Sequence, residues 1–187
     1  MSATIANYQA LALEKLTTDF EEVKKAFREK LGFDFKTKIG LGQYPRPNAQ
    51  NFVAAAWNDS KADEVIFNIN RLNIYDNRQA IVHELVHGLQ FQYKAFKVPA
   101  DEMFPHSFDF AITSAFCKHT LGYQKKWFFD QYDMYEDVAF PSLLVKPAQY
   151  DYLICQEDFK DMDSLITRSH QIARGMRRIA ERTYDEI

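Results

Sequence analysis

A chain of 187 residues, 47% of them apolar, is long enough to bury one hydrophobic core without disulfide bonds. The formal net charge of −3 argues against a strongly basic surface, so nucleic acid remains a partner only through a local patch. Two cysteines, Cys117 and Cys155, stand too far apart in the sequence to indicate a disulfide framework or a zinc ribbon, and we expect buried thiols in a reducing compartment.

Residues 1–16 lack the basic and apolar regions of a signal peptide, and the chain has no run of about 18 apolar residues. These features predict a soluble, cytoplasmic protein with no membrane partner. The chain is rich in aromatic residues, with 16 Phe and 10 Tyr. Such a composition is typical either of a tightly packed core or of exposed patches through which a protein assembles into a larger complex.

The first predicted element is a helix over residues 18–31. Its apolar positions at helical spacing are Phe20, Val23, Phe27 and Leu31. Thr18 followed by Glu21 has the spacing of a capping box, which predicts that the helix begins there. Gly32 is expected to end it, because glycine readily adopts the left-handed conformation found after many helices.

Three short strands are predicted next, over residues 33–41, 52–57 and 64–70. A turn-rich connection at 42–48, in which two prolines prevent helix, and a polar turn at 58–61 separate them. Short strands beside helices indicate an α+β domain with a small sheet of about three strands.

Two further helices are predicted after the strands. The first can be capped by Asp76 or Asn77 and should end before Pro99. Its apolar face contains Val82, Leu85, Leu89, Tyr93 and Phe96. The second covers residues 107–121.

Residues 123–158 show no clean periodicity, and a final amphipathic helix follows over residues 162–180. The polar side of this helix is basic, with Arg174, Arg177, Arg178 and Arg182. We expect a single domain over residues 1–187, on which residues 123–187 pack as a C-terminal extension.

The predicted helix after the strands contains the motif His83-Glu84-Leu85-Val86-His87. Two imidazoles four residues apart project from one helix face and can bind one metal ion. Catalytic zinc sites use three protein ligands and leave the fourth position to water, whose proton a carboxylate such as Glu84 can accept as general base. The motif therefore predicts a Zn²⁺ site with His83 and His87 as ligands.

The alternative is a coincidence, in which two partly buried histidines bond to local carboxylates. Among chains with this content of His and Glu, about one in a hundred would contain the motif by chance. A third ligand must come from elsewhere in the chain, and the nearby downstream candidates are Glu102, His106 and Asp109.

Residues 83–90, His-Glu-Leu-Val-His-Gly-Leu-Gln, and residues 106–111, His-Ser-Phe-Asp-Phe-Ala, together resemble the SprT-like zincins, including those encoded by phages. The strand at 65–70 also matches the strand that these proteins place before their active helix. The resemblance covers residues 64–116. It implies a zincin-like domain, with His106 as the third zinc ligand. Asp109 is the alternative third ligand, or a group that orients a ligand.

The motif and the resemblance predict a zinc-dependent hydrolase, a metallopeptidase that cleaves peptide bonds in a protein or peptide substrate. A second possibility is a non-catalytic structural or binding protein, such as a virion or assembly subunit, that retains a zincin scaffold. A third is a DNA-associated SprT-like protease, for which the basic face of the last helix is the only compositional support. A phage-encoded protein of this kind could be virion-associated.

Overall fold

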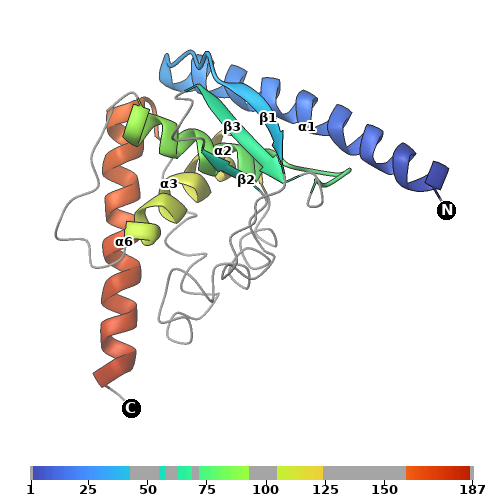
Figure 1. Cartoon of the computed structure of the whole chain (residues 1–187). Coiled ribbons are helices and arrows are strands. Elements are labelled where there is room, and N and C mark those ends of the chain that lie inside the picture. Colours follow the sequence, from blue (N-terminus) through green and yellow to red (C-terminus); the bar gives the residue numbers. More distant parts are fainter. Residues whose placement is uncertain are drawn as a thin grey trace. The chain divides into compact units, whose positions relative to one another are not determined.

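The computed structural model describes residues 2–42, 55–57, 63–68, 72–92, 105–123 and 159–185 (Figure 1). The chain divides into two compact units, Met1–Lys94 and Ala95–Ile187. Helix α1, the small sheet and the helix with the His-Glu-x-x-His motif belong to the first unit, and two long helices belong to the second.

Helix α1 (Ser2–Leu31) is much longer than the predicted helix, and the start predicted at Thr18 is wrong. The Thr18 hydroxyl donates a hydrogen bond of 3.0 Å to the carbonyl oxygen of Glu14, one turn back inside the helix. The segment before it is rich in alanine and leucine, which favour helix, so the chain is helical well before the threonine. One buried stripe runs through both halves: Ala12, Leu16, Phe20, Val23 and Phe27.

Gly32 ends α1 as predicted. Its φ of 69° is left-handed, and its N–H donates to the carbonyl oxygen of Arg28 at 3.0 Å. The N–H of Phe33 donates to the carbonyl oxygen of Phe27 at 3.4 Å. These two bonds satisfy carbonyl groups that the last turn of a helix otherwise leaves unpaired.

The sheet contains β1 (Lys38–Gly42), β2 (Ala55–Trp57) and β3 (Glu64–Asn68), in the order β1-β3-β2. Strand β1 is parallel to β3, and β2 is antiparallel to β3. All three predicted strands have a counterpart, so a mixed fold with helices and a small sheet is confirmed for the described residues.

The first predicted strand begins too early, because residues 33–37 form no regular structure. Phe35 is buried and packs edge to face on Phe27, with ring centroids 5.2 Å apart, and Phe33 lies 4.8 Å from Phe35. The alternation of this segment thus reflects burial of Phe35 against α1 and of Thr37, whereas regular strand structure begins only at Lys38.

The core of the first unit lies between α1, the sheet and the following helix. Val65 and Phe67 of β3 are buried, and the ring of Phe67 meets that of Phe20 on α1 edge to face at 6.3 Å. Helix α2 (Arg78–His87) follows the sheet and packs against α1 and β2. Its buried apolar residues are Ile81, Val82, Leu85 and Val86.

In the second unit, α3 (Pro105–Thr120) packs against α6 (Met162–Asp185). Both helices were predicted, and most of their described apolar positions are buried: Ala111, Ile112, Ala115 and Phe116 on α3, and Leu165, Ile172 and Ala173 on α6. Met162 and Ile166, also predicted on the apolar face of α6, are only half-buried. Cys117 is buried, as predicted, and forms no disulfide with any described residue. Cys155 and nearly all of the segment predicted to be irregular, up to residue 158, lie outside the described residues. None of the described helices is long and apolar enough to cross a membrane.

Helix α6 begins at a reciprocal cap formed by Asp161 and Ser164. The N–H of Ser164 donates to Asp161 Oδ1 at 2.8 Å, and the N–H groups of Lys160 and Asp161 donate to Ser164 Oγ at 2.8 and 2.9 Å. Hydrogen bonds from the backbone and the side chain of Ser164 lower the pKa of the Asp161 carboxyl, and the charge of Lys160 adds to this.

Candidate metal centre

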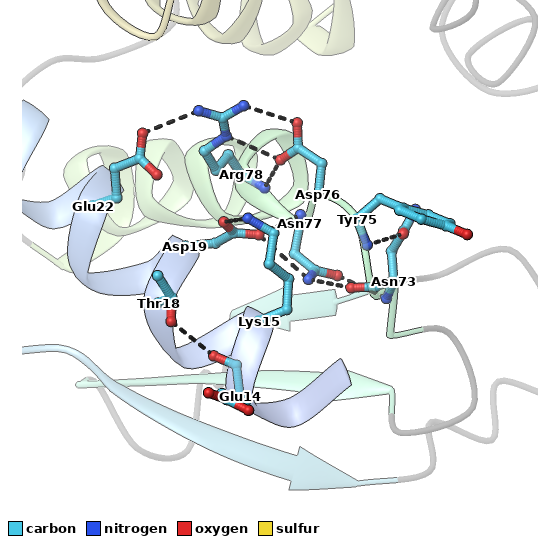
Figure 2. A network of polar contacts seen from close by, with 10 residues as sticks. All are labelled: Glu14, Lys15, Thr18, Asp19, Glu22, Asn73, Tyr75, Asp76, Asn77 and Arg78. Atoms are coloured by element: carbon cyan, nitrogen blue, oxygen red, sulfur yellow. Dashed lines mark hydrogen bonds and ion pairs between the residues drawn. The ribbon is translucent and has the colours of Figure 1, made fainter. Parts of the chain in front are cut away.

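The start of α2 is fixed by a polar network that reaches across to α1 (Figure 2). Asn77 occupies the N-cap position, as predicted, but its side chain does not cap the helix. Its carboxamide instead bonds twice to the backbone of Asn73, at 2.9 and 2.7 Å. Asp76 takes over part of the capping role, because its Oδ1 accepts the N–H of Arg78 at 2.9 Å.

The residue that anchors α2 to α1 is Asp19, whose side chain is completely buried. Its Oδ2 accepts the backbone N–H of Asn77 at 2.7 Å, and its Oδ1 accepts a hydrogen bond from Lys15 Nζ at 2.6 Å. A carboxylate at a helix N-terminus is favourable because the helix dipole is positive there. The bond therefore fixes where α2 begins relative to α1.

A second connection between the two helices passes through Arg78. Its guanidinium donates to Glu22 Oε1 on α1 at 3.0 Å and to both carboxylate oxygens of Asp76 at 3.1 Å (Figure 2). The first turn of α2 is therefore bonded to α1 through both Asp19 and Glu22, and the histidines follow in the next turns of α2.

His83 and His87 face each other one turn apart on α2. Their Nε2 atoms are 3.0 Å apart, and their rings are nearly perpendicular, with centroids separated by 4.6 Å. Two nitrogens bound to one tetrahedral zinc at about 2.05 Å each would lie about 3.3 Å apart. The two nitrogens thus converge to nearly the spacing that one zinc ion requires.

Glu84 follows His83 on the same turn and is buried, with 7% of its surface exposed, whereas both imidazoles are half-buried. Buried carboxylates are uncommon unless they are paired, hydrogen-bonded or bound to a metal. A buried acid beside two converging imidazoles supplies the residue types of a hydrolytic zinc centre.

Directly after His87 the helix widens into a π-helical turn, η2 (Gly88–Gln92). The N–H of Gly88 still donates to the carbonyl oxygen of Glu84, as in an α-helix, and also to that of Leu85. A continuous α-helix was predicted here as far as the segment before Pro99, and helix is confirmed up to Gln92. The residues beyond it lie outside the described part of the chain.

The π-helical turn contains Gln90, a site residue that the motif did not indicate. Its Oε1 lies 3.2 Å from His87 Nδ1, the ring nitrogen on the side away from His83. The only signal in the sequence was the spacing of three residues, which places two side chains on neighbouring positions of a helix.

The three predicted residues of the motif lie together on α2, and the third ligand stays a prediction. His106 and Asp109 belong to the first turns of α3, in the second unit, where the structure describes the backbone alone, and Glu102 is outside the described residues. Among the side chains that are described, no group of three His, Cys, Asp or Glu residues is placed to hold a metal ion.

Comparisons with models of protein families, with curated proteins and with solved structures give no match to this chain. The geometry of α2 and the chemistry of its side chains are therefore the basis for a functional proposal.

Proposed function

We propose that this chain is a zinc-dependent hydrolase, and specifically a metallopeptidase. The observation that carries the proposal is the 3.0 Å separation of the Nε2 atoms of His83 and His87. This pair lies on a helix whose intervening residue Glu84 is buried. Nitrogen donors that converge in this way suit zinc, and a carboxylate on the same turn suits the transfer of a proton.

In this proposal His83 and His87 are two of the zinc ligands, and a residue of α3 provides the third. His106 is the preferred third ligand, because the chain resembles SprT-like zincins there, and Asp109 is the alternative. Zinc, when bound, polarises a carbonyl group and lowers the pKa of a coordinated water.

Glu84 acts as the general base and then as the general acid. It accepts a proton from the water that attacks the peptide carbonyl, and it returns that proton to the nitrogen of the leaving amine. Its burial supports this role, because the charge interactions of a buried carboxylate are screened less than those of a carboxylate at the surface. The choice of a peptide bond as substrate comes from the motif and its family resemblance.

The proposal is tested with protein purified without added metal, by measuring its zinc content and its hydrolysis of a mixed peptide library. Glu84→Gln should retain zinc and lower kcat by at least about 100-fold, because general acid–base catalysis contributes this much or more. His83→Ala should lose the metal. Glu29→Gln, at an exposed glutamate of α1, is the matched control and should change neither quantity.

Hydrolysis that persists in zinc-loaded Glu84→Gln would exclude the proposed mechanism. A wild-type protein that binds zinc stoichiometrically but cleaves nothing in the library would instead support the non-catalytic zinc scaffold. A wild-type protein that binds no divalent ion would end the metal proposal altogether.

A further inference from the structure

We propose that Gln90 is a positioning residue, which holds His87 in the tautomer with the proton on Nδ1. The imidazole of His87 lies between two partners: Gln90 Oε1 is 3.2 Å from Nδ1, and His83 Nε2 is 3.0 Å from Nε2. The metal-binding part of this inference rests on the proposed function, but the tautomer itself can be measured without metal.

The direction of each hydrogen bond follows from the partner on the Nδ1 side. A carboxamide oxygen only accepts hydrogen bonds, so Nδ1 of His87 must be the donor toward Gln90. A neutral imidazole has one N–H and one lone pair, so Nε2 of His87 then has the lone pair. His83 then donates its Nε2–H to the lone pair on His87 Nε2, with 3.0 Å between the two nitrogens.

The opposite tautomer of His87 would fit these contacts poorly. A lone pair on Nδ1 would face the lone pairs of the amide oxygen, and the half-buried pair would lose its hydrogen bond. Gln90 lies within the π-helical turn η2, and such turns occur often at functional sites.

In the metal-free protein, therefore, only one of the two histidines has the tautomer that can bind a metal through Nε2. His87 already directs a lone pair from Nε2 toward His83, and the acceptor on its Nδ1 side makes it a better ligand. His83 presents an N–H from the same atom and must give up that proton before its Nε2 can bind a metal.

The experiment is a measurement of ring ¹⁵N chemical shifts by NMR, first on metal-free protein and then after addition of zinc. In the metal-free wild type, His87 should show a protonated Nδ1 and His83 a protonated Nε2. Zinc should leave the His87 tautomer unchanged and remove the proton from Nε2 of His83. Protonated Nε2 on His87 in the metal-free wild type would overturn the assignment.

Variants at position 90 test the positioning role. Gln90→Met removes the acceptor at similar side-chain length, so His87 should populate both tautomers and zinc affinity should fall about 10- to 100-fold. Gln90→Glu keeps an acceptor and should preserve the Nδ1–H tautomer and tight binding. Gln79→Met, at a half-buried glutamine in the first turn of the same helix, is the control and should match the wild type.

The results separate the two proposals. If the wild type binds no zinc, the proposed function fails, and the metal-free spectra still decide whether Gln90 sets the tautomer. If zinc binds but Gln90→Met retains both the wild-type tautomer and the wild-type affinity, the positioning role is refuted. Circular dichroism of each variant establishes that it is folded, and the wild-type spectra alone decide the question should Gln90→Met unfold.

Discussion

Asp19 accepts a hydrogen bond from the backbone N–H of Asn77 at 2.7 Å, across 58 residues of sequence. The carboxylate is fully buried, and its other oxygen accepts from Lys15 Nζ at 2.6 Å (Figure 2). One acid on α1 thereby fixes the first turn of the helix that contains both histidines. The position of the candidate ligands thus depends on a residue far from the motif.

Replacement of Asp19 should destabilise the protein strongly. We expect Asp19→Ala to lower the free energy of unfolding by about 3 kcal/mol, because it leaves a buried N–H and a partly buried ammonium without their acceptor. Urea unfolding followed by circular dichroism measures the change. Asp34→Ala, at an acid that is 68% exposed, is the control and should cost less than about 0.5 kcal/mol. Equal effects of both variants would show that the buried bond contributes little.

The third zinc ligand can be identified by the size of the loss in affinity. If His106 binds the metal directly, His106→Ala should weaken zinc binding by more than about 100-fold, whereas loss of an outer hydrogen-bond partner costs about 10- to 100-fold. Asp109→Asn should then show the smaller effect or none. Competition with a chelator of known affinity measures the zinc affinity of each variant. A larger loss in Asp109→Asn than in His106→Ala would assign Asp109 as the ligand.

The cap of α6 should make stability depend on pH in acid. The pKa of Asp161 is lowered from its usual value of 3.8 in the folded state, so the carboxylate stabilises the fold above pH 3.8. That contribution is lost as the pH falls through the lowered pKa. We expect the stability difference between wild type and Asp161→Asn to be constant near neutral pH and to shrink below pH 3.8. A difference that stays constant to the acid limit would contradict the role of the charged cap.

Gly32 and Gly122 end α1 and α3 with the same φ of 69°, and a Cβ at either position would meet nothing within 4 Å. Any cost of alanine there must arise from the backbone conformation alone. We expect Gly32→Ala and Gly122→Ala each to lower stability by about 1 kcal/mol, and asparagine to cost less at both sites. Thermal unfolding measures the effect, and a neutral alanine at either position would show that the helix end rearranges.

Helix type and position were predictable where apolar spacing is regular, as in α3 and α6, because burial of one face determines both. The start of α1 was not predictable in this way. Thr18 and Glu21 fit a helix interior as well as a cap, because the Thr18 hydroxyl can bond back to the carbonyl oxygen of Glu14. Alternation over residues 33–37 indicated burial correctly, but periodicity does not reveal whether a segment has a strand to pair with.

The candidate site was predictable to the extent that its chemistry is local in sequence. His83, Glu84 and His87 follow from a motif of five residues on one helix. Asp19 could not be found in this way, because it acts on Asn77 from a distant helix through a single backbone bond. Gln90 was missed because the motif ends at His87, and a spacing of three residues is too common on helices to single out one polar contact.

The order of the sheet has a consequence for how the first unit is assembled. Strands β1 and β2 are both bonded to β3, which is the last of the three along the chain and lies in the centre. During synthesis neither outer strand has its partner until β3 emerges, and their exposed edges are open to wrong pairing until then. Helix α2 emerges after β3, and its buried residues complete the core of the first unit. The helix that contains the histidine pair therefore cannot pack until the central strand has been synthesised.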